Sequence, residues 1–268
     1  MERLIAGVEV IYHLACLGVR HSVHSPLLNH EVNATATLQL LRMARIAGVG
    51  RFVHVSSSEV YGTAMTVPMT ESHPTYPMTV YGGAKLAGEA YARAFHRTYG
   101  FPTVVVRPFN TFGRCSHHEG DSGEVIPKFM LRALAGKPVV IFGDGQQTRD
   151  FIHVRDTAAA IVLCGQSDQV IGETINIGSG QEITINHLSD IVAEVVGRDL
   201  QREYQPERPG DTLRLFSDPA KAKGLLGFVP QVSLREGLED LLTWYQRLGS
   251  SVQMLLDQEL VRNWEVPS

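Results

Sequence analysis

The chain has 268 residues, of which 44% are hydrophobic and 19% charged, and its formal net charge is −4. This balance excludes a basic nucleic-acid-binding protein and a polybasic membrane-surface protein, and the length suits one large α/β domain or two smaller lobes. Cys16, Cys115 and Cys164 lie far apart without Cys-x-x-Cys spacing, which argues against a zinc site or a disulfide framework. We find no signal-peptide pattern and no membrane-spanning run, so the sequence predicts a cytoplasmic protein without a bound metal.

The first part of the sequence alternates between strand-like and helix-like segments. We predict strands at residues 8–15, 51–58 and 102–109, and helices at residues 29–49 and 81–99. The strands are mostly apolar and β-branched, as in a sheet that is buried on both faces. This alternation predicts an α/β fold with a doubly wound parallel sheet, in which ligands bind beyond the carboxyl ends of the strands.

The composition of the sequence changes after residue 111. A polar, glycine-containing stretch leads into a predicted helix at residues 125–135, and a second helix is predicted near residues 186–196. We interpret this region as a smaller, mixed α/β lobe. The last stretch, residues 250–268, is predicted to form a terminal helix and tail to which we assign no chemistry.

Tyr81 and Lys85 are one helical turn apart at the start of the second predicted helix, so their side chains project from the same face. A nearby ammonium favours the phenolate and lowers the pKa of a tyrosine, which could then remove a proton from an alcohol. Ser57 ends a strand 24 residues earlier, where its hydroxyl can converge on the pair. A Tyr-x-x-x-Lys pair by itself is often only an exposed pair without a functional role. Serines at a strand end often only form a turn.

Several stretches of the sequence follow one another in the order and at the spacing that are typical of one known protein family. They are "VIYHLA", "EVNATATLQLLRMARIAGV", "RFVHVSSSEVYG", "TVYGGAKLAGE", "VVVRPFNTFG", "VIFGDGQQTRDFIHVRD", "INIGSG" and "RPGD". Over roughly residues 8–245 the chain resembles the extended short-chain dehydrogenase/reductase family, whose members include NAD-dependent, UDP-glucose 4-epimerase-like nucleotide-sugar epimerases and dehydratases. The resemblance implies a Rossmann-like NAD-binding domain at residues 1–111, with return elements at about 149–178, and a nucleotide-sugar lobe at residues 112–268.

The resemblance also implies a role for individual residues. The catalytic group would be Ser57, Tyr81 and Lys85, with Glu59 beside them. NAD would contact Tyr81 and Lys85 together with Leu14, Ala15, Asn33, Val55, Ser56 and Pro108. The nucleotide sugar, which is UDP-linked in most look-alikes, would contact Asn110, Val125, Lys128, Arg149, Arg208 and Asp211. The two long helices, residues 29–47 and 81–99, would pair with those of a second copy as a four-helix bundle.

One departure from the family pattern concerns the cofactor. The family opens with a G-x-x-G-x-x-G turn that places the NAD pyrophosphate on a helix N-terminus, and this sequence has no such turn. Two hypotheses follow. The sequence is a piece of a longer enzyme, which we favour because the rest of the site is intact, or it is a truncated, non-catalytic homologue that acts as a binding or dimerisation partner.

Glu59 helps to distinguish among the reactions that members of this family catalyse. An epimerase oxidises C4 of the sugar and returns the hydride to the other face, whereas a 4,6-dehydratase or a UDP-glucuronate decarboxylase carries the 4-keto intermediate further. An acid two residues after the catalytic serine is compatible with the last two, although acids at strand ends often only pair locally. The "SSS" and "RPFNTFG" stretches favour an epimerase. The histidines at 117 and 118 lie in a polar loop that we interpret as solvated rather than metal-binding.

Overall fold

The structure, a computed structural model, describes residues 5–265, so the ends of the two predicted lobes, residues 1–4 and 266–268, lie outside it. Its central feature is a parallel sheet in the order β1 (Val10–His13), β2 (Arg51–Val55), β3 (Thr103–Pro108) and β8 (Thr174–Ile177). Tyr12 lies opposite Val53, and Val53 lies opposite Val104. The predicted parallel α/β sheet is confirmed, and β2 is buried at every position, including Arg51 and His54.

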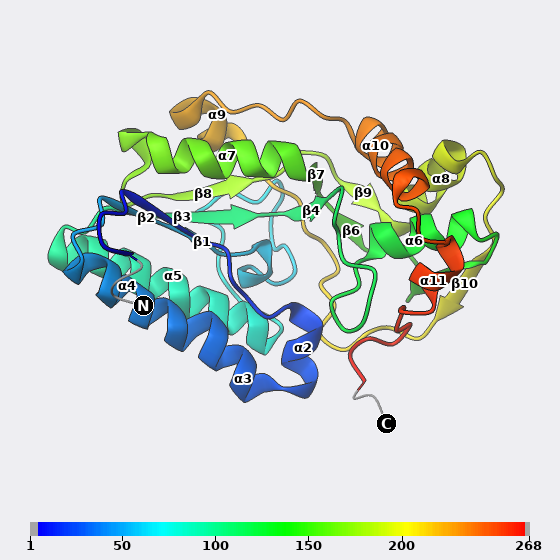
Figure 1. Cartoon of the computed structure of the whole chain (residues 1–268), viewed down its shortest axis with the longest axis horizontal. Helices are drawn as coiled ribbons and strands as arrows, with labels where there is room; N and C mark the ends of the chain where they lie inside the picture. Colours follow the sequence, from blue (N-terminus) through cyan, green and yellow to red (C-terminus); the bar gives the residue numbers. More distant parts are fainter. Residues whose placement is uncertain (1–4, 266–268) are drawn as a thin grey trace.

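Helices cover both faces of this sheet (Figure 1). On one face lie α4 (Ala36–Ile46) and α5 (Val80–Tyr99), and on the other lie α7 (Val154–Gln166) and α9 (Ala220–Leu226). Helix α5 starts where the Thr79 side chain accepts a hydrogen bond from the Gly82 amide, and it ends at the left-handed Gly100. No helix within residues 5–265 combines the length and the apolar character needed to cross a membrane.

The connection from β1 to α4 differs from the single predicted helix at residues 29–49. It contains α2 (Val19–His24), α3 (Pro26–His30) and one π-helical turn, Glu31–Thr35, before α4 begins. Buried polar side chains explain this path. The Asn29 and Asn33 amides donate to the Leu17 carbonyl at 3.2 and 2.9 Å, which ties the loop after β1 to the helix.

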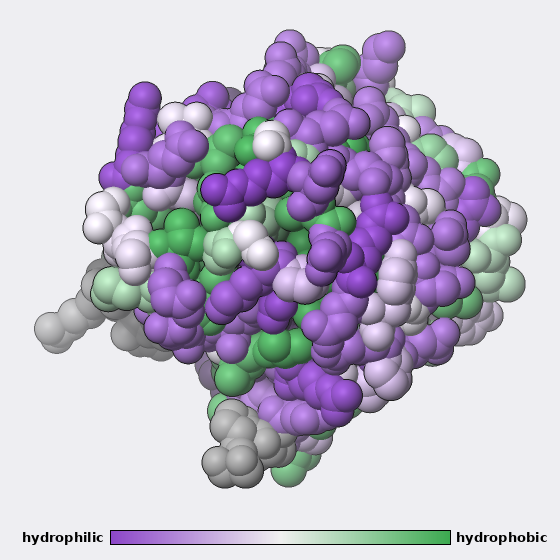
Figure 2. Space-filling view, turned by 90° about the vertical axis from the view of Figure 1, so that its right-hand side faces the viewer, coloured by the Kyte–Doolittle hydropathy of each residue, from purple (hydrophilic) through white to green (hydrophobic). Residues whose placement is uncertain are grey.

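The second group of elements surrounds its own core. It comprises α6 (Val125–Leu134), β5 (Val139–Phe142), α8 (Ile185–Val196), β10 (Arg202–Gln205), α10 (Leu234–Arg247) and α11 (Val252–Leu256). Phe129, Leu188 and Leu241 are among the buried side chains that join these elements. Short ladders, β4 (Asn110–Phe112) with β7 (Phe151–His153) and β6 (Thr148–Arg149) with β9 (Ile183–Thr184), lie near the main sheet. Figure 2 shows a largely hydrophilic surface on this side of the molecule, with scattered hydrophobic patches.

The C-terminal stretch is helical only over α11, which is shorter than predicted. The chain beyond it docks against α6 and the loop before α6, because polar groups there satisfy one another. The Asn263 amide donates to the carbonyls of Asp121 and Gly123 at 3.1 and 2.9 Å, and Lys128 Nζ donates to the Leu260 carbonyl at 2.8 Å.

Candidate active site

A cavity of about 430 Å³ lies where the strand ends of the main sheet face the second group of elements. Ser57, Tyr81 and Pro108 line it from the sheet side, and Lys128 and Arg208 line it from the other side. The carboxyl ends of parallel strands are the expected ligand position in such sheets. The cavity therefore joins residues that lie far apart in the sequence.

Tyr81 and Lys85 both lie on the buried face of α5, as their spacing predicts, and Lys85 is only 2% exposed. Lys85 Nζ donates to the Val55 carbonyl at 2.6 Å, which fixes the ammonium against the end of β2. Burial lowers the pKa of Lys85. Tyr81 and Ser57 both line the cavity, whereas Lys85 is not among its lining residues and directs its ammonium to the Val55 carbonyl.

The sequence-based expectation that Lys85 lowers the pKa of Tyr81 is wrong for this structure. Burial and the neighbouring Cys16 raise the pKa of Tyr81, and hydrogen bonding with the Ser57 side chain opposes the rise only in part. Burial in surroundings of low polarity disfavours the charged form of the phenol, and it is the largest cause of the rise in pKa. An additional positive charge beside the phenol would be needed to reverse this balance.

The residues assigned to NAD meet at one edge of the sheet, with one exception. Val55 and Ser56 end β2 and Pro108 ends β3, while Leu14 and Ala15 are exposed just after β1. Lys85 uses one of its three ammonium protons on the Val55 carbonyl, so donors remain for a ribose or nicotinamide group. The side chains at this edge therefore fit the nicotinamide end of NAD.

Asn33 is the exception among the residues assigned to NAD. Its amide donates to the Leu17 carbonyl and to Asn29 Oδ1, both at 2.9 Å, and its oxygen accepts from the Leu17 amide at 3.1 Å. Its polar groups are thus engaged by the protein. The placement supports a role in holding the loop after β1 rather than a contact with the cofactor.

The residues assigned to the nucleotide sugar also meet, around a shared carboxylate. Arg149 donates to Asp211 Oδ1 at 2.6 Å, and Arg208 donates to Asp211 Oδ2 at 2.8 Å. The guanidinium of Arg208 also lies over the Phe142 ring, 5.3 Å from its centroid. Asn110 reaches the same cavity, and its side-chain oxygen is buried without a partner. Val125 begins α6 at the cavity wall, and Lys128 follows one turn later.

Glu59 lies in the cavity wall, close to the end of β2. Burial raises the pKa of this carboxyl, and the cations of Arg149 and Arg20 oppose the rise. A carboxyl whose pKa is raised can hold a proton nearer to neutral pH, and this is the property that a general acid needs.

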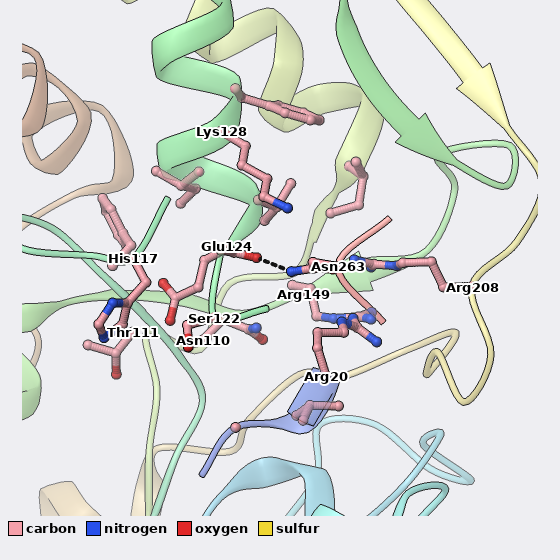
Figure 3. A pocket seen from close by; sticks show the side chains of 18 of the residues that line it. Arg20, Asn110, Thr111, His117, Ser122, Glu124, Lys128, Arg149, Arg208 and Asn263 are labelled. Atoms are coloured by element: carbon pink, nitrogen blue, oxygen red, sulfur yellow. Dashed lines mark hydrogen bonds between the residues drawn. The ribbon is translucent and has the colours of Figure 1, made fainter. Parts of the chain in front are cut away.

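Several further residues of the cavity wall are not among the substrate or cofactor contacts predicted from the sequence. They are Arg20, Glu124 and Asn263, which Figure 3 labels, together with Phe142. Asn263 belongs to the tail to which we assigned no chemistry. The His117 and Glu119 side chains are 2.7 Å apart, but no group of three potential metal ligands occurs in the part of the chain that the structure describes. Arg20 and Asn263 reach the cavity only through the three-dimensional paths of α2 and of the tail.

A parallel sheet with a buried Tyr–Lys pair near its ligand edge and a cavity lined by several arginines is the arrangement of a Rossmann-like enzyme. The family model for GDP-mannose 4,6 dehydratase matches residues 1–241, and the chain belongs to this family of NAD-dependent nucleotide-sugar epimerases and dehydratases. The resemblance that the sequence indicates is therefore confirmed at the level of the family and its enzymatic class.

Individual proteins of known identity agree with this membership. A UDP-glucose 4-epimerase of Mycolicibacterium smegmatis is 36% identical, with 89% of this chain and 76% of that protein covered. A dTDP-glucose 4,6-dehydratase of Streptomyces venezuelae, solved with NAD bound, is 35% identical with a TM-score of 0.86. The match covers 91% of this chain and 75% of that protein. A UDP-glucose 4-epimerase of Thermotoga maritima, solved with UDP-glucose, is 33% identical with a TM-score of 0.88. The match covers 92% of this chain and 81% of that protein.

Proposed function

We propose that this protein is an NAD-dependent UDP-hexose 4-epimerase that works through a 4-keto intermediate. The observation that carries the proposal is that Ser57 and Tyr81 face the same cavity as the Arg149–Asp211–Arg208 cluster. The catalytic hydroxyls and the cationic cluster are thus arranged for the sugar and the diphosphate of one ligand. The similarity to epimerases from two organisms supports this choice among the reactions of the family.

In this proposal the protein's own residues bind the substrate and move a proton. Arg149 and Arg208 hold the diphosphate, because a guanidinium forms paired, charge-assisted hydrogen bonds with phosphate oxygens. Tyr81 takes the proton of the C4 hydroxyl, Ser57 orients that hydroxyl, and Lys85 keeps the phenolate in place. NAD supplies the acceptor and donor of the C4 hydride and a positive charge that favours the phenolate. The ketone then turns its other face before Tyr81 returns the proton.

Glu59 favours a second candidate, a 4,6-dehydratase or a UDP-glucuronate decarboxylase. The carboxyl lies in the cavity wall two residues beyond Ser57, and burial raises its pKa. A protonated carboxyl at that position could donate its proton to a leaving hydroxyl group at C6. The similarity to a dTDP-glucose 4,6-dehydratase supports this alternative.

The experiment that tests these proposals consists of three separate reactions. Each contains the chain, NAD and one nucleotide sugar: UDP-glucose, UDP-glucuronate or dTDP-glucose. An epimerase gives a product of unchanged mass with a new C4 configuration by NMR. A product that has lost water or carbon dioxide would assign the chain to the second candidate instead. Ligand binding without turnover would support the hypothesis of a non-catalytic partner.

We further propose that the chain forms a homodimer in the cytoplasm, with a cofactor lobe at 1–111 that has return elements at about 149–178, and with a substrate lobe at 112–268. Leu27 on α3 and Ile46 on α4 are 81% and 60% exposed, which supports a second copy against these helices. The three cysteines are free, which supports a reducing compartment. Light scattering of the purified chain tests the dimer, and a monomeric mass would contradict it.

A further inference from the structure

Arg20 is the second residue of α2, in the connection after β1, and its side chain lines the same cavity as Arg149 and Arg208. Figure 3 shows it extending from α2 toward Arg149. The cationic cluster therefore receives side chains from three separate parts of the chain. Two of them were expected to bind the substrate, and the third was not.

The three guanidinium groups differ in how the protein uses them. Arg149 donates to the carbonyls of Thr148 and Thr212, each at 2.8 Å, as well as to Asp211. Arg208 directs both Nε and Nη2 at Asp211, at 3.1 and 2.8 Å. Three of the five N–H donors of Arg149 and two of the five of Arg208 are thus already used within the fold.

Arg20 makes no hydrogen bond and no ion pair within residues 5–265, and its Nη1 is buried without a partner. An unpartnered donor of a buried cation is costly, and such groups normally find an acceptor. Arg20 thus combines a full set of free donors with a position at the cavity wall.

The charges around Arg20 favour an anion at this position. Asp211 is the carboxylate that pairs with both Arg149 and Arg208, so it cannot neutralise the whole cluster. Burial and the positive charge of Arg208 lower the pKa of Arg20 to about 10, and the group is still a cation at neutral pH. Glu59 is the other carboxyl that acts on Arg20, and its own pKa is raised. A bound oxyanion would balance this positive charge.

We propose that Arg20 is a substrate-binding residue whose guanidinium takes an oxyanion of the nucleotide sugar, either the diphosphate or a carboxylate on the sugar. This inference rests on the proposed function, because it assumes that a nucleotide sugar occupies the cavity. The oxyanion supplies the acceptors that Arg20 lacks. Arg20 then completes a grip in which Arg149 and Arg208 are already oriented by Asp211.

The test is isothermal titration of the full chain and its Arg20→Gln variant with UDP, UDP-glucose and UDP-glucuronate. The inference predicts a loss of roughly 10- to 100-fold in affinity, the range for a hydrogen bond to a charged group. An equal loss for all three ligands would assign Arg20 to the diphosphate. A loss confined to UDP-glucuronate would assign it to the sugar carboxylate. Unchanged affinities for all three would overturn the inference.

Two controls separate binding from structural effects. Arg247→Gln removes an equal charge from an exposed site at the end of α10 and should leave every affinity unchanged. Arg20→Gln should unfold at the same temperature as the wild type or a higher one, because Arg20 makes no bond within the fold. A lower unfolding temperature together with weaker binding would make Arg20 a structural residue and contradict the inference. A wild-type chain that binds none of the ligands would contradict the proposed function itself.

Discussion

Glu89 on α5 and Arg107 on β3 form a buried ion pair, and Glu89 lies on the same face of α5 as Tyr81 and Lys85. Arg107 Nε donates to Glu89 Oε1 at 2.8 Å, and Nη2 donates to Oε2 at 2.6 Å. The Ser56 hydroxyl donates to the same carboxylate at 2.6 Å. Glu89 follows Lys85 by one helical turn, so this pair ties the helix that carries Tyr81 to the ends of β2 and β3.

Glu89→Gln should destabilise the fold strongly, since it leaves the Arg107 cation buried without a counter-charge. Breaking one side of a buried pair costs about 3–5 kcal/mol of the free energy of unfolding. Urea unfolding of the variant measures this loss. A loss below about 1 kcal/mol, the ceiling for exposed pairs, would show that the pair contributes no more than a surface contact.

A double replacement provides the control for that experiment. Glu89→Leu combined with Arg107→Leu removes both buried charges, while the Ser56 hydroxyl and the partly exposed Arg93 lose their carboxylate partner. Apolar replacement of a buried ion pair is often neutral. The double variant should therefore lose less stability than Glu89→Gln alone. Equal or greater loss would mean that the shape of the site, rather than an unpaired charge, accounts for the effect.

Two glycines of α5 should respond in opposite ways to alanine. A Cβ at Gly88 would lie 2.7 Å from His54 Nε2, so Gly88→Ala should cost about 1–3 kcal/mol through overpacking. A Cβ at Gly83 would meet nothing within 4 Å, so Gly83→Ala should stabilise the helix by about 0.5–1 kcal/mol. Thermal unfolding of both variants checks the contrast, which equal shifts would contradict.

Acid should weaken the fold through two buried histidines. Burial, aided by the Lys85 cation, lowers the pKa of His13 from 6.5 to about 4, and the same causes lower that of His54 well below 6.5. Below pH 6.5 the unfolded chain therefore binds protons that the folded chain does not, and stability falls as the pH drops. For His13 the loss levels off below about pH 4.

His54→Leu isolates one of these two groups. Both ring nitrogens of His54 are buried without partners, so an apolar side chain should leave stability near neutral pH unchanged or raised. The variant should also lose less stability than the wild type between about pH 7 and about pH 5. Urea midpoints at the two pH values measure this difference, and identical losses in both proteins would refute the role of His54.

Asn263 should hold the C-terminal tail against the cavity. Asn263→Ala removes two hydrogen bonds to the loop before α6, and each contributes about 0.5–1.5 kcal/mol. The tail should then be cut faster in limited proteolysis, while the midpoint of global unfolding changes little. Unchanged cleavage would show that other contacts, such as Lys128 with the Leu260 carbonyl, suffice.

The sequence predicts best what depends on local pattern. The strands and α5 follow from hydrophobic spacing, and the one-turn separation of Tyr81 and Lys85 places them on one face whatever surrounds the helix. The stretches that resemble the family also predict Arg149, Arg208 and Asp211 as contacts of the nucleotide sugar. Their mutual pairing through one carboxylate is visible only in the structure.

What the sequence does not predict depends on contacts between distant segments. Asn33 looks like a cofactor ligand, yet the loop after β1 uses its whole amide. The pKa of Tyr81 depends on how deeply the phenol is buried, which spacing along a helix cannot give. The roles of Arg20 and of the tail residue Asn263 likewise depend on where α2 and the chain end pack around the cavity.

The central claim is that the Tyr81 phenol removes the proton from the sugar alcohol in a cavity that other residues use to bind the nucleotide. The most direct test compares wild-type and Tyr81→Phe protein for conversion of UDP-glucose in the presence of NAD and for UDP affinity by calorimetry. We predict a loss of conversion by roughly 10²- to 10⁴-fold with unchanged UDP affinity. Conversion at the wild-type rate by Tyr81→Phe would contradict the account.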